Sequence, residues 1–199
     1  MDLSEINFAV LVASLIVAST PLVLAALGEL IVEKSGVLNL GVEGMMIIGA
    51  VTGFIVGVET GSAYIGMMAA AMAGALLSLL FAFIILIMQA NQVASGLALT
   101  IFGLGIAALM GHPYTGIKSP QISTISIPFI SEIPILGTMF FQHDLIVYLS
   151  LISVLVIWYF LNRMRAGLIL RSVGEDHDVA HSLGSVSYTH LTLPTKVYV

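Results

Sequence analysis

Five long apolar runs set the limits on what this chain can fold into. Each is about 20 residues long, which is the length that a helix needs to cross the hydrocarbon core of a bilayer. The runs are continuous and do not alternate apolar with polar residues, so they indicate helices and not barrel strands. Only 9% of the residues are charged, against about 25% in a soluble domain. We therefore predict an all-α polytopic membrane helix bundle with spans at about residues 8–27, 36–58, 63–88, 93–111 and 145–161.

The segments around these runs give the first hints of organisation. No basic residue precedes the run at residues 8–27, which is longer than the roughly 7–15 apolar residues of a signal peptide, so we expect a retained first span. The long connection at residues 112–144 is rich in proline. We expect it to form a loop outside the membrane with short extended segments.

The basic residues predict the orientation in the membrane. Arg163, Arg165 and Arg171 follow the fifth span, and Lys34 lies between the first two. With five spans, these places are on the same side, and Lys118 in the long loop is on the other. Basic residues gather on the cytoplasmic side of membrane proteins. The sequence therefore predicts a cytoplasmic Arg-rich segment and an N-terminus outside.

Small residues recur every fourth position in three of the spans. This spacing lets the backbones of membrane helices approach closely. We interpret the positions as packing surfaces and not as binding sites. They are Gly49, Gly53 and Gly57 in the second span, Gly66, Ala70, Gly74 and Ser78 in the third, and Gly103, Ala107 and Gly111 in the fourth.

Two polar residues, Asn39 and Glu43, lie one helical turn apart at the mouth of the second span. Polar groups entering a bilayer are costly, and they usually face a protein interior or a water-filled path. One interpretation is that the carboxylate caps the span or pairs with Lys34. The other is that the two residues line a translocation path or fix a broken helix. Gln92 and Ser95 also have two interpretations. They belong either to an interfacial turn or to the lining of the cytoplasmic mouth of the path.

After the fifth span the chain becomes polar. Ser172 and Glu175 have the spacing of a capping box, and the acidic residues that follow suit the positive end of a helix. A small apolar stripe follows, and Gly184 fits the position just after a helix end. The sequence predicts a short helix over about residues 173–183 on the cytoplasmic side of the membrane.

Several classes of function are excluded or disfavoured. There is no cysteine, so disulfides and cysteine-bound metals are excluded. No phosphate-binding loop is present, so ATP hydrolysis is not expected of this chain. His177 and His181 have a metal-like spacing, but they lie on a predicted charged, solvent-facing helix, so we expect no metal and no cofactor. The net charge of −5 argues against a nucleic-acid partner.

Four stretches together resemble the membrane permease of bacterial ABC importers, in the nucleoside and simple-sugar branch related to ribose and branched-chain amino-acid permeases. The resemblance covers about residues 6–184. It implies that Glu175, Ala180 and Gly184 belong to the surface of a coupling helix that docks on an ATPase. The stretches are TPLVLAALG at residues 20–28, EKSGVLNLGVEG at 33–44, VASGLALT at 93–100 and RSVGEDHDVAHSLG at 171–184.

The resemblance implies a non-enzymatic subunit of the bacterial inner membrane that imports nucleosides, or alternatively simple sugars such as ribose or galactose. Its implied partners are a separate ATPase, a second permease subunit, an extracytoplasmic solute-binding protein and membrane lipid. Two other classes stay open. An ion-driven secondary transporter needs ionisable residues near mid-membrane. A non-transport membrane scaffold needs neither a capped cytoplasmic helix nor the Asn39/Glu43 pair.

The end of the chain differs in composition from the rest. Over Ser185–Val199, the Gly, Ala, Ile and Met of the spans give way to Ser, Thr and Tyr. This stretch resembles a translated adapter sequence, although a natural polar tail is the alternative, and we exclude it from fold reasoning. Because members of the family continue with further spans, we expect residues 1–184 to be the N-terminal part of a permease domain.

Overall fold

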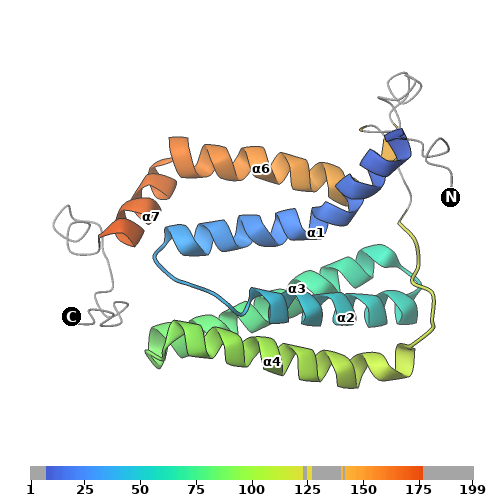
Figure 1. Cartoon of the computed structure of the whole chain (residues 1–199), viewed down its shortest axis with the longest axis horizontal. Coiled ribbons are helices and arrows are strands. Elements are labelled where there is room, and N and C mark those ends of the chain that lie inside the picture. Colours follow the sequence, from blue (N-terminus) through green and yellow to red (C-terminus); the bar gives the residue numbers. More distant parts are fainter. Residues whose placement is uncertain (1–7, 123–124, 127–139, 141, 177–199) are drawn as a thin grey trace. The chain divides into compact units, whose positions relative to one another are not determined.

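The computed structural model describes residues 8–122, 125–126, 140 and 142–176, and this part of the chain is almost entirely helical (Figure 1). Within it, five helices are long and apolar enough to cross a membrane, which confirms the predicted all-α membrane bundle. The elements are α1 (Phe8–Lys34), α2 (Val42–Thr60), α3 (Ala63–Ala82), the π-helix η2 (Phe83–Ile87), α4 (Gln92–Gly111), the 3₁₀-helix η3 (His112–Tyr114), β1 (Ile125–Ser126), β2 (Gln142–His143), α6 (Leu145–Arg163) and α7 (Arg165–Glu175).

The chain divides into two compact units. The first contains most of α1 together with both strands and α6, and the second contains the end of α1, α2, α3, α4 and α7. Their bounds are Met1–Gly28 with Ile122–Met164, and Glu29–Gln121 with Arg165–Val199.

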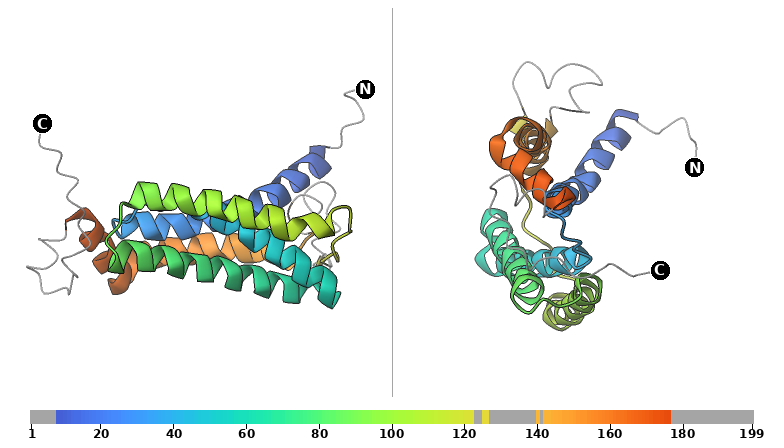
Figure 2. Two further views of the ribbon diagram at one scale, coloured as in Figure 1. Left: turned by 90° about the horizontal axis from the view of Figure 1, so that it is seen from below. Right: turned by 90° about the vertical axis from the view of Figure 1, so that its left-hand side faces the viewer.

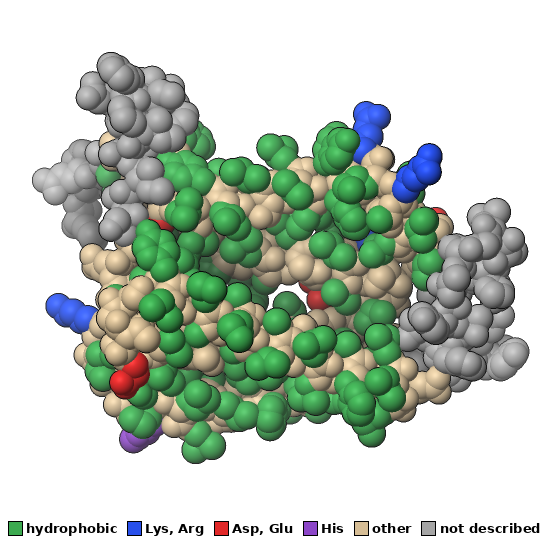
Figure 3. Space-filling model, turned by 180° about the vertical axis from the view of Figure 1, so that it is seen from behind, with side chains coloured by type: hydrophobic (Ala, Val, Ile, Leu, Met, Phe, Trp, Pro, Cys, Tyr) green, Lys and Arg blue, Asp and Glu red, His purple; other side chains and the backbone are tan. Residues whose placement is uncertain are grey.

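Large apolar side chains remain exposed along the spans. Leu109 is 78% exposed and Ile101 is 71% exposed, and Figure 3 shows hydrophobic side chains over most of the visible face. A soluble monomer rarely presents such a continuous apolar surface. Together with the five candidate spans, this surface identifies a multi-pass membrane protein.

Helix α2 packs against both α3 and α4 in the second unit, and Figure 2 shows the three helices side by side. The contacts run through glycines. A Cβ atom added to Gly66 would lie 2.5 Å from the carbonyl oxygen of Gly53, and one added to Gly103 would lie 2.8 Å from Cα of Gly44. No side chain fits at these positions, so the packing surfaces predicted at Gly53, Gly66 and Gly103 are confirmed.

A small apolar cluster lies where these helices meet near the start of α2. It joins Met45 of α2 to Phe81 of α3, Ile85 of η2 and Leu99 of α4, all of them buried. The π-helix η2 ends α3, and Gln89 follows it with a φ of 52°. A π-helix adds one residue to a turn and often marks a functional position in a helix.

The ends of two predicted spans were wrong. Helix α1 continues to Lys34 and does not stop at residue 27, while α2 begins at Val42 and not at residue 36. Helix α1 then ends in a Schellman motif, in which the Gly36 amide donates to the Glu33 carbonyl at 3.0 Å and the Val37 amide donates to the Val32 carbonyl at 3.3 Å. Gly36, with a φ of 87°, is the left-handed residue that this motif requires.

The predicted helix over residues 173–183 also differs from the structure. Helix α7 begins at Arg165 and ends at Glu175, so Ser172 lies inside it and is not its N-cap. The Ser172 hydroxyl donates back to the Ile169 carbonyl at 2.8 Å, a bond that satisfies the side chain within the preceding turn. Residues 177–184, with Ala180 and Gly184, lie outside the described residues, as does Ser185–Val199.

Part of the long loop is described. β1 and β2 pair antiparallel, with Ile125 opposite His143. This two-residue pairing agrees with the short extended segments predicted for residues 112–144. Nearer to η3, the Tyr114 hydroxyl donates to the Glu59 carboxylate at 2.7 Å and joins η3 to the end of α2.

Candidate functional site

Residues 35–41 connect α1 to α2 without forming a helix, and we call them the α1–α2 segment. The segment lies along α4. The Leu38 amide donates to Oε1 of Gln92 at 2.9 Å, and the Thr100 hydroxyl donates to the Leu40 carbonyl at 3.0 Å. Gln92 is the first residue of α4, and Thr100 follows about 12 Å further along the helix axis. The segment therefore follows the first two turns of α4.

The α1–α2 segment enters the depth of a candidate membrane span, because α4 belongs to the span Gln92–Tyr114. Non-helical backbone at membrane depth is tolerated only where protein buries it or where it lines a water-filled cavity. Helix α2 begins at this depth. A Cβ atom added to Gly44 would lie 2.7 Å from the Leu99 carbonyl oxygen and from Cα of Thr100. The second span is thus a non-helical entry followed by a helix.

Asn39 holds the segment at its centre. It is 7% exposed. Its Oδ1 accepts from the Gly41 amide at 2.9 Å, its backbone amide donates to Oε1 of Glu29 at 3.1 Å, and its Nδ2 lies 3.8 Å from the Met45 sulfur. An Asn side chain that bonds the backbone two residues on builds a turn. These contacts favour the interpretation that Asn39 fixes a broken helix.

Glu43 lies in the first turn of α2 and is exposed. The N-cap residue is Gly41, and no side chain caps the helix, so the predicted cap by the carboxylate is not formed. The described residues include no ion pair between Glu43 and Lys34 either. A negative charge at this end of a helix is favoured by the helix dipole. A role for Glu43 in the path stays a prediction.

The other two predicted path residues have different surroundings. Gln92 contacts the α1–α2 segment through its bond to Leu38. Ser95 is half-buried one turn later on α4, and its backbone amide bonds to the Asn91 carbonyl. In the described part of the chain, no hydrogen bond joins the Ser95 side chain to the segment. The structure therefore places both Asn39 and Gln92 at the α1–α2 segment. Ser95 lies on the next turn of α4 and does not hold the segment by its side chain in the described part of the chain.

Sequence reasoning missed two residues of the site, Glu29 and Thr100. Glu29 bonds to the α1–α2 segment from the helix directly before it, and Thr100 bonds to it from α4, 60 residues away in sequence. For Glu29 a signal existed, since an ionisable residue within a candidate span is a functional hypothesis by default. Thr100 gave none, because a threonine in a membrane helix commonly bonds to its own helix.

A few polar groups surround the α1–α2 segment. Among the described residues, no group of three His, Asp or Glu side chains is placed to hold a metal ion. The polar side chains that converge on the segment are the amides of Asn39 and Gln92, the Thr100 hydroxyl and the Glu29 carboxylate, with the buried Met45 beside Asn39. These groups hold the non-helical segment at a few separate points.

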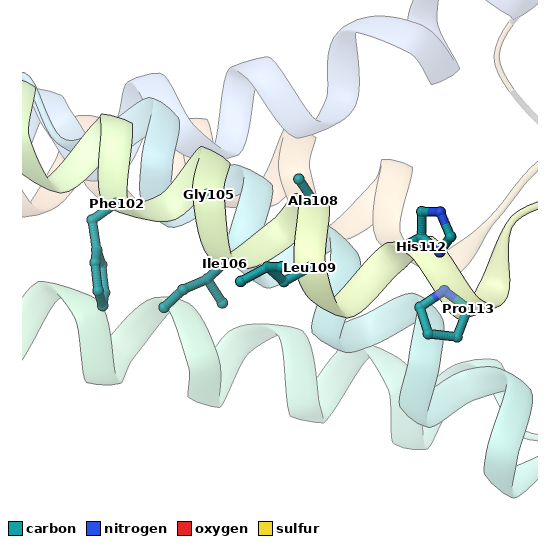
Figure 4. Close-up of a pocket in the computed structure, with 7 residues that line it drawn as sticks. All are labelled: Phe102, Gly105, Ile106, Ala108, Leu109, His112 and Pro113. Atoms are coloured by element: carbon teal, nitrogen blue, oxygen red, sulfur yellow. The ribbon is translucent and has the colours of Figure 1, made fainter.

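An open apolar groove runs along α4 and η3, and its lining includes none of the predicted path residues (Figure 4). It measures about 740 Å³. Its lining is apolar apart from His112, so it offers little to orient a polar solute. The lining residues are Phe102, Gly105, Ile106, Ala108, Leu109, His112 and Pro113.

Comparison with known proteins gives a consistent set of relatives. Residues 11–193 match the model of a family described as "Branched-chain amino acid transport system / permease component". A putative glucose ABC transporter permease protein of Haloferax volcanii is 39% identical over 171 residues, which cover 84% of this chain and 52% of that protein. A guanosine ABC transporter permease protein of Bacillus subtilis is 36% identical over 199 residues, covering 92% of this chain and 61% of that protein.

A third relative is a nucleoside ABC transporter permease protein of Lactococcus lactis. It is 32% identical over 192 residues, which cover 91% of this chain and 61% of that protein. The chain thus spans between about half and three fifths of the length of these curated relatives. No solved structure matches the chain.

Proposed function

Because the chain belongs to the family of branched-chain amino acid transport permease components, we propose that it is the membrane permease of an ATP-driven importer for nucleosides. The observation that carries the proposal is the α1–α2 segment. Non-helical backbone at membrane depth, held by polar side chains, is the construction that transporters use at their solute sites. The names of two relatives, a guanosine and a nucleoside ABC transporter permease protein, support the proposed class of transporter and of solute.

The mechanism is inferred from the relatives, which are named as ABC transporter permeases. ATP is hydrolysed on a separate ATPase subunit. A second permease subunit completes the path, and an extracytoplasmic binding protein delivers the solute. The complex lies in the bacterial inner membrane. Closure of the ATPase pair moves the cytoplasmic side of the permease, and the site changes the side to which it is exposed.

Simple sugars are the second candidate solute. The Haloferax volcanii relative is named for glucose, and its identity to this chain is 39%. Nucleosides carry a sugar ring themselves, so a site that offers amides and hydroxyls suits both solutes. Uptake, and not residue type, separates the two.

The test is uptake of labelled guanosine and labelled glucose into proteoliposomes that hold a full-length permease with this segment, its ATPase and its binding protein. We expect guanosine uptake that requires ATP and survives an ionophore. If glucose but not guanosine is taken up, the solute is a simple sugar and not a nucleoside. Uptake that the ionophore abolishes would indicate a secondary transporter. Failure of any ATPase to copurify, with no uptake, would favour the scaffold.

A further inference from the structure

Helix α7 touches the end of α1 backbone to backbone. A Cβ atom added to Gly174 would lie 2.9 Å from the Gly36 amide nitrogen and would overlap the Lys34 carbonyl oxygen. From the other side, a Cβ atom added to Gly36 would lie 3.2 Å from Cα of Gly174. No side chain separates the two backbones at this point. A movement of α7 is therefore passed on directly, because close-packed groups transmit displacement and no flexible side chain absorbs it.

The contact falls on the first residues of the α1–α2 segment. Gly36 is the left-handed residue of the Schellman motif that ends α1, and its amide is already bonded to the Glu33 carbonyl. Asn39 follows three residues later. A displacement at Gly36 must either strain the motif or shift the chain toward Asn39.

The segment beyond Gly36 is held at separate points by hydrogen bonds to Glu29, Gln92 and Thr100. Each of these three bonds comes from a single side chain on α1 or α4. A segment pinned in this way moves as a unit or exchanges one set of bonds for another, and does not deform gradually. Discrete rearrangements of this kind are how small shifts at one site become large changes at another.

We propose that Gly174 is a positioning residue that couples α7 to the α1–α2 segment, so that movement of α7 by the ATPase resets the backbone around Asn39. The inference rests on the proposed function, since it presumes an ATPase that moves α7. What it adds to that function is the path by which movement passes through the permease, from α7 through Gly174 to the α1–α2 segment. Solute specificity does not depend on it.

Gly174→Ala in a full-length permease tests the coupling. The new Cβ atom overlaps backbone, so α7 must shift away from Gly36. We expect the ATPase to copurify and hydrolyse ATP as before, while uptake per ATP hydrolysed falls roughly 2- to 30-fold, the range seen for residues along coupling networks. Gly28→Ala is the matched control. It places the same methyl group on a helix where no atom of the described residues lies within 4 Å, and uptake should not change.

A second measurement separates coupling from a simple packing defect. Leu40 is 39% exposed, and a Leu40→Cys variant reports on the segment through its rate of thiol labelling. In an otherwise unchanged permease, ATP should change this rate. In the Gly174→Ala background, the ATP-dependent change should be lost, while labelling without ATP persists.

Two results would overturn the proposal. One is normal coupled uptake in Gly174→Ala, or in Gly36→Ala, which disturbs the same contact from the other side. The other is an ATP-dependent labelling change at Leu40→Cys that survives Gly174→Ala. A permease that binds no ATPase and takes up no solute even without these substitutions would instead refute the proposed function.

Discussion

Asn39 shows how one side chain replaces secondary structure at membrane depth. Its side-chain Oδ1 accepts from the Gly41 amide, and its own backbone amide donates to the Glu29 carboxylate. Unpaired backbone groups cost several kcal/mol in the hydrocarbon region. The residue therefore stabilises a non-helical path that no run of local propensity would favour.

Asn39→Ala removes the acceptor of the buried Gly41 amide. Because a buried donor loses its partner, we expect the variant to lose about 1–3 kcal/mol of stability. Thermal unfolding of the detergent-solubilised full-length permease measures the loss. Asn162→Ala is the control, since Asn162 is exposed and bonds only to the preceding turn of α6. Equal losses in both variants would contradict a special role for Asn39.

Glu43→Gln tests the path at the second predicted residue. Glu43 is exposed and its side chain caps nothing, so the neutral isostere should change the stability by less than about 0.5 kcal/mol. If Glu43 lines the route, uptake falls although membrane insertion is intact. Glu33→Gln, on an exposed carboxylate of α1, serves for comparison. Normal uptake in Glu43→Gln would remove Glu43 from the path.

At the scale of elements, the helices pack through glycine because lipid offers no hydrophobic drive for helix association. Helices α2 and α4 meet at Gly44 and Gly103, and α2 and α3 meet at Gly53 and Gly66. These contacts fix where α2 begins against α4. They therefore set the depth at which the α1–α2 segment enters the bundle.

Gly103→Ala should push α4 away from α2. Its new methyl group would lie 2.8 Å from backbone atoms of Gly44, and overpacking of this kind costs about 1–3 kcal/mol. Two residues further on, the methyl group of Gly105→Ala meets no atom of the described part of the chain within 4 Å. Unfolding of both variants in detergent gives the comparison. A loss confined to Gly103→Ala is expected, and similar stabilities would argue that the contact is loose.

Hydropathy was enough to predict the spans, because an apolar run of this length must be buried in lipid or protein, however the helices pack. It could not predict where α2 begins. Residues 35–41 are held by Gln92 and Thr100, which are more than 50 residues away in sequence. The capping box at Ser172 was misread for a related reason. Helix α7 begins earlier, at Arg165, and the Ser172 hydroxyl bonds to a carbonyl of the same helix.

At the scale of the whole molecule, the basic residues of the second unit gather mainly at one of its ends, as a single orientation in the membrane requires. The α7 residue Gly174 meets the backbone of Lys34, so the cationic Arg165 and Arg171 of α7 belong to the end of the unit that carries Lys34. Lys118 follows Tyr114 beyond the far end of α4. The grouping matches the predicted cytoplasmic excess of basic residues.

This polarity predicts which ends a membrane-impermeant thiol reagent reaches. The chain has no cysteine, so an introduced one is labelled without background from this segment. We expect the exposed Ser119→Cys to be labelled in intact cells that produce a full-length permease, because it follows Lys118 on the outer side. The exposed Glu175→Cys, at the end of α7, should react only after the membrane is permeabilised. Labelling of Glu175→Cys in intact cells, with Ser119→Cys protected, would invert the orientation and place α7 out of reach of any cytoplasmic ATPase.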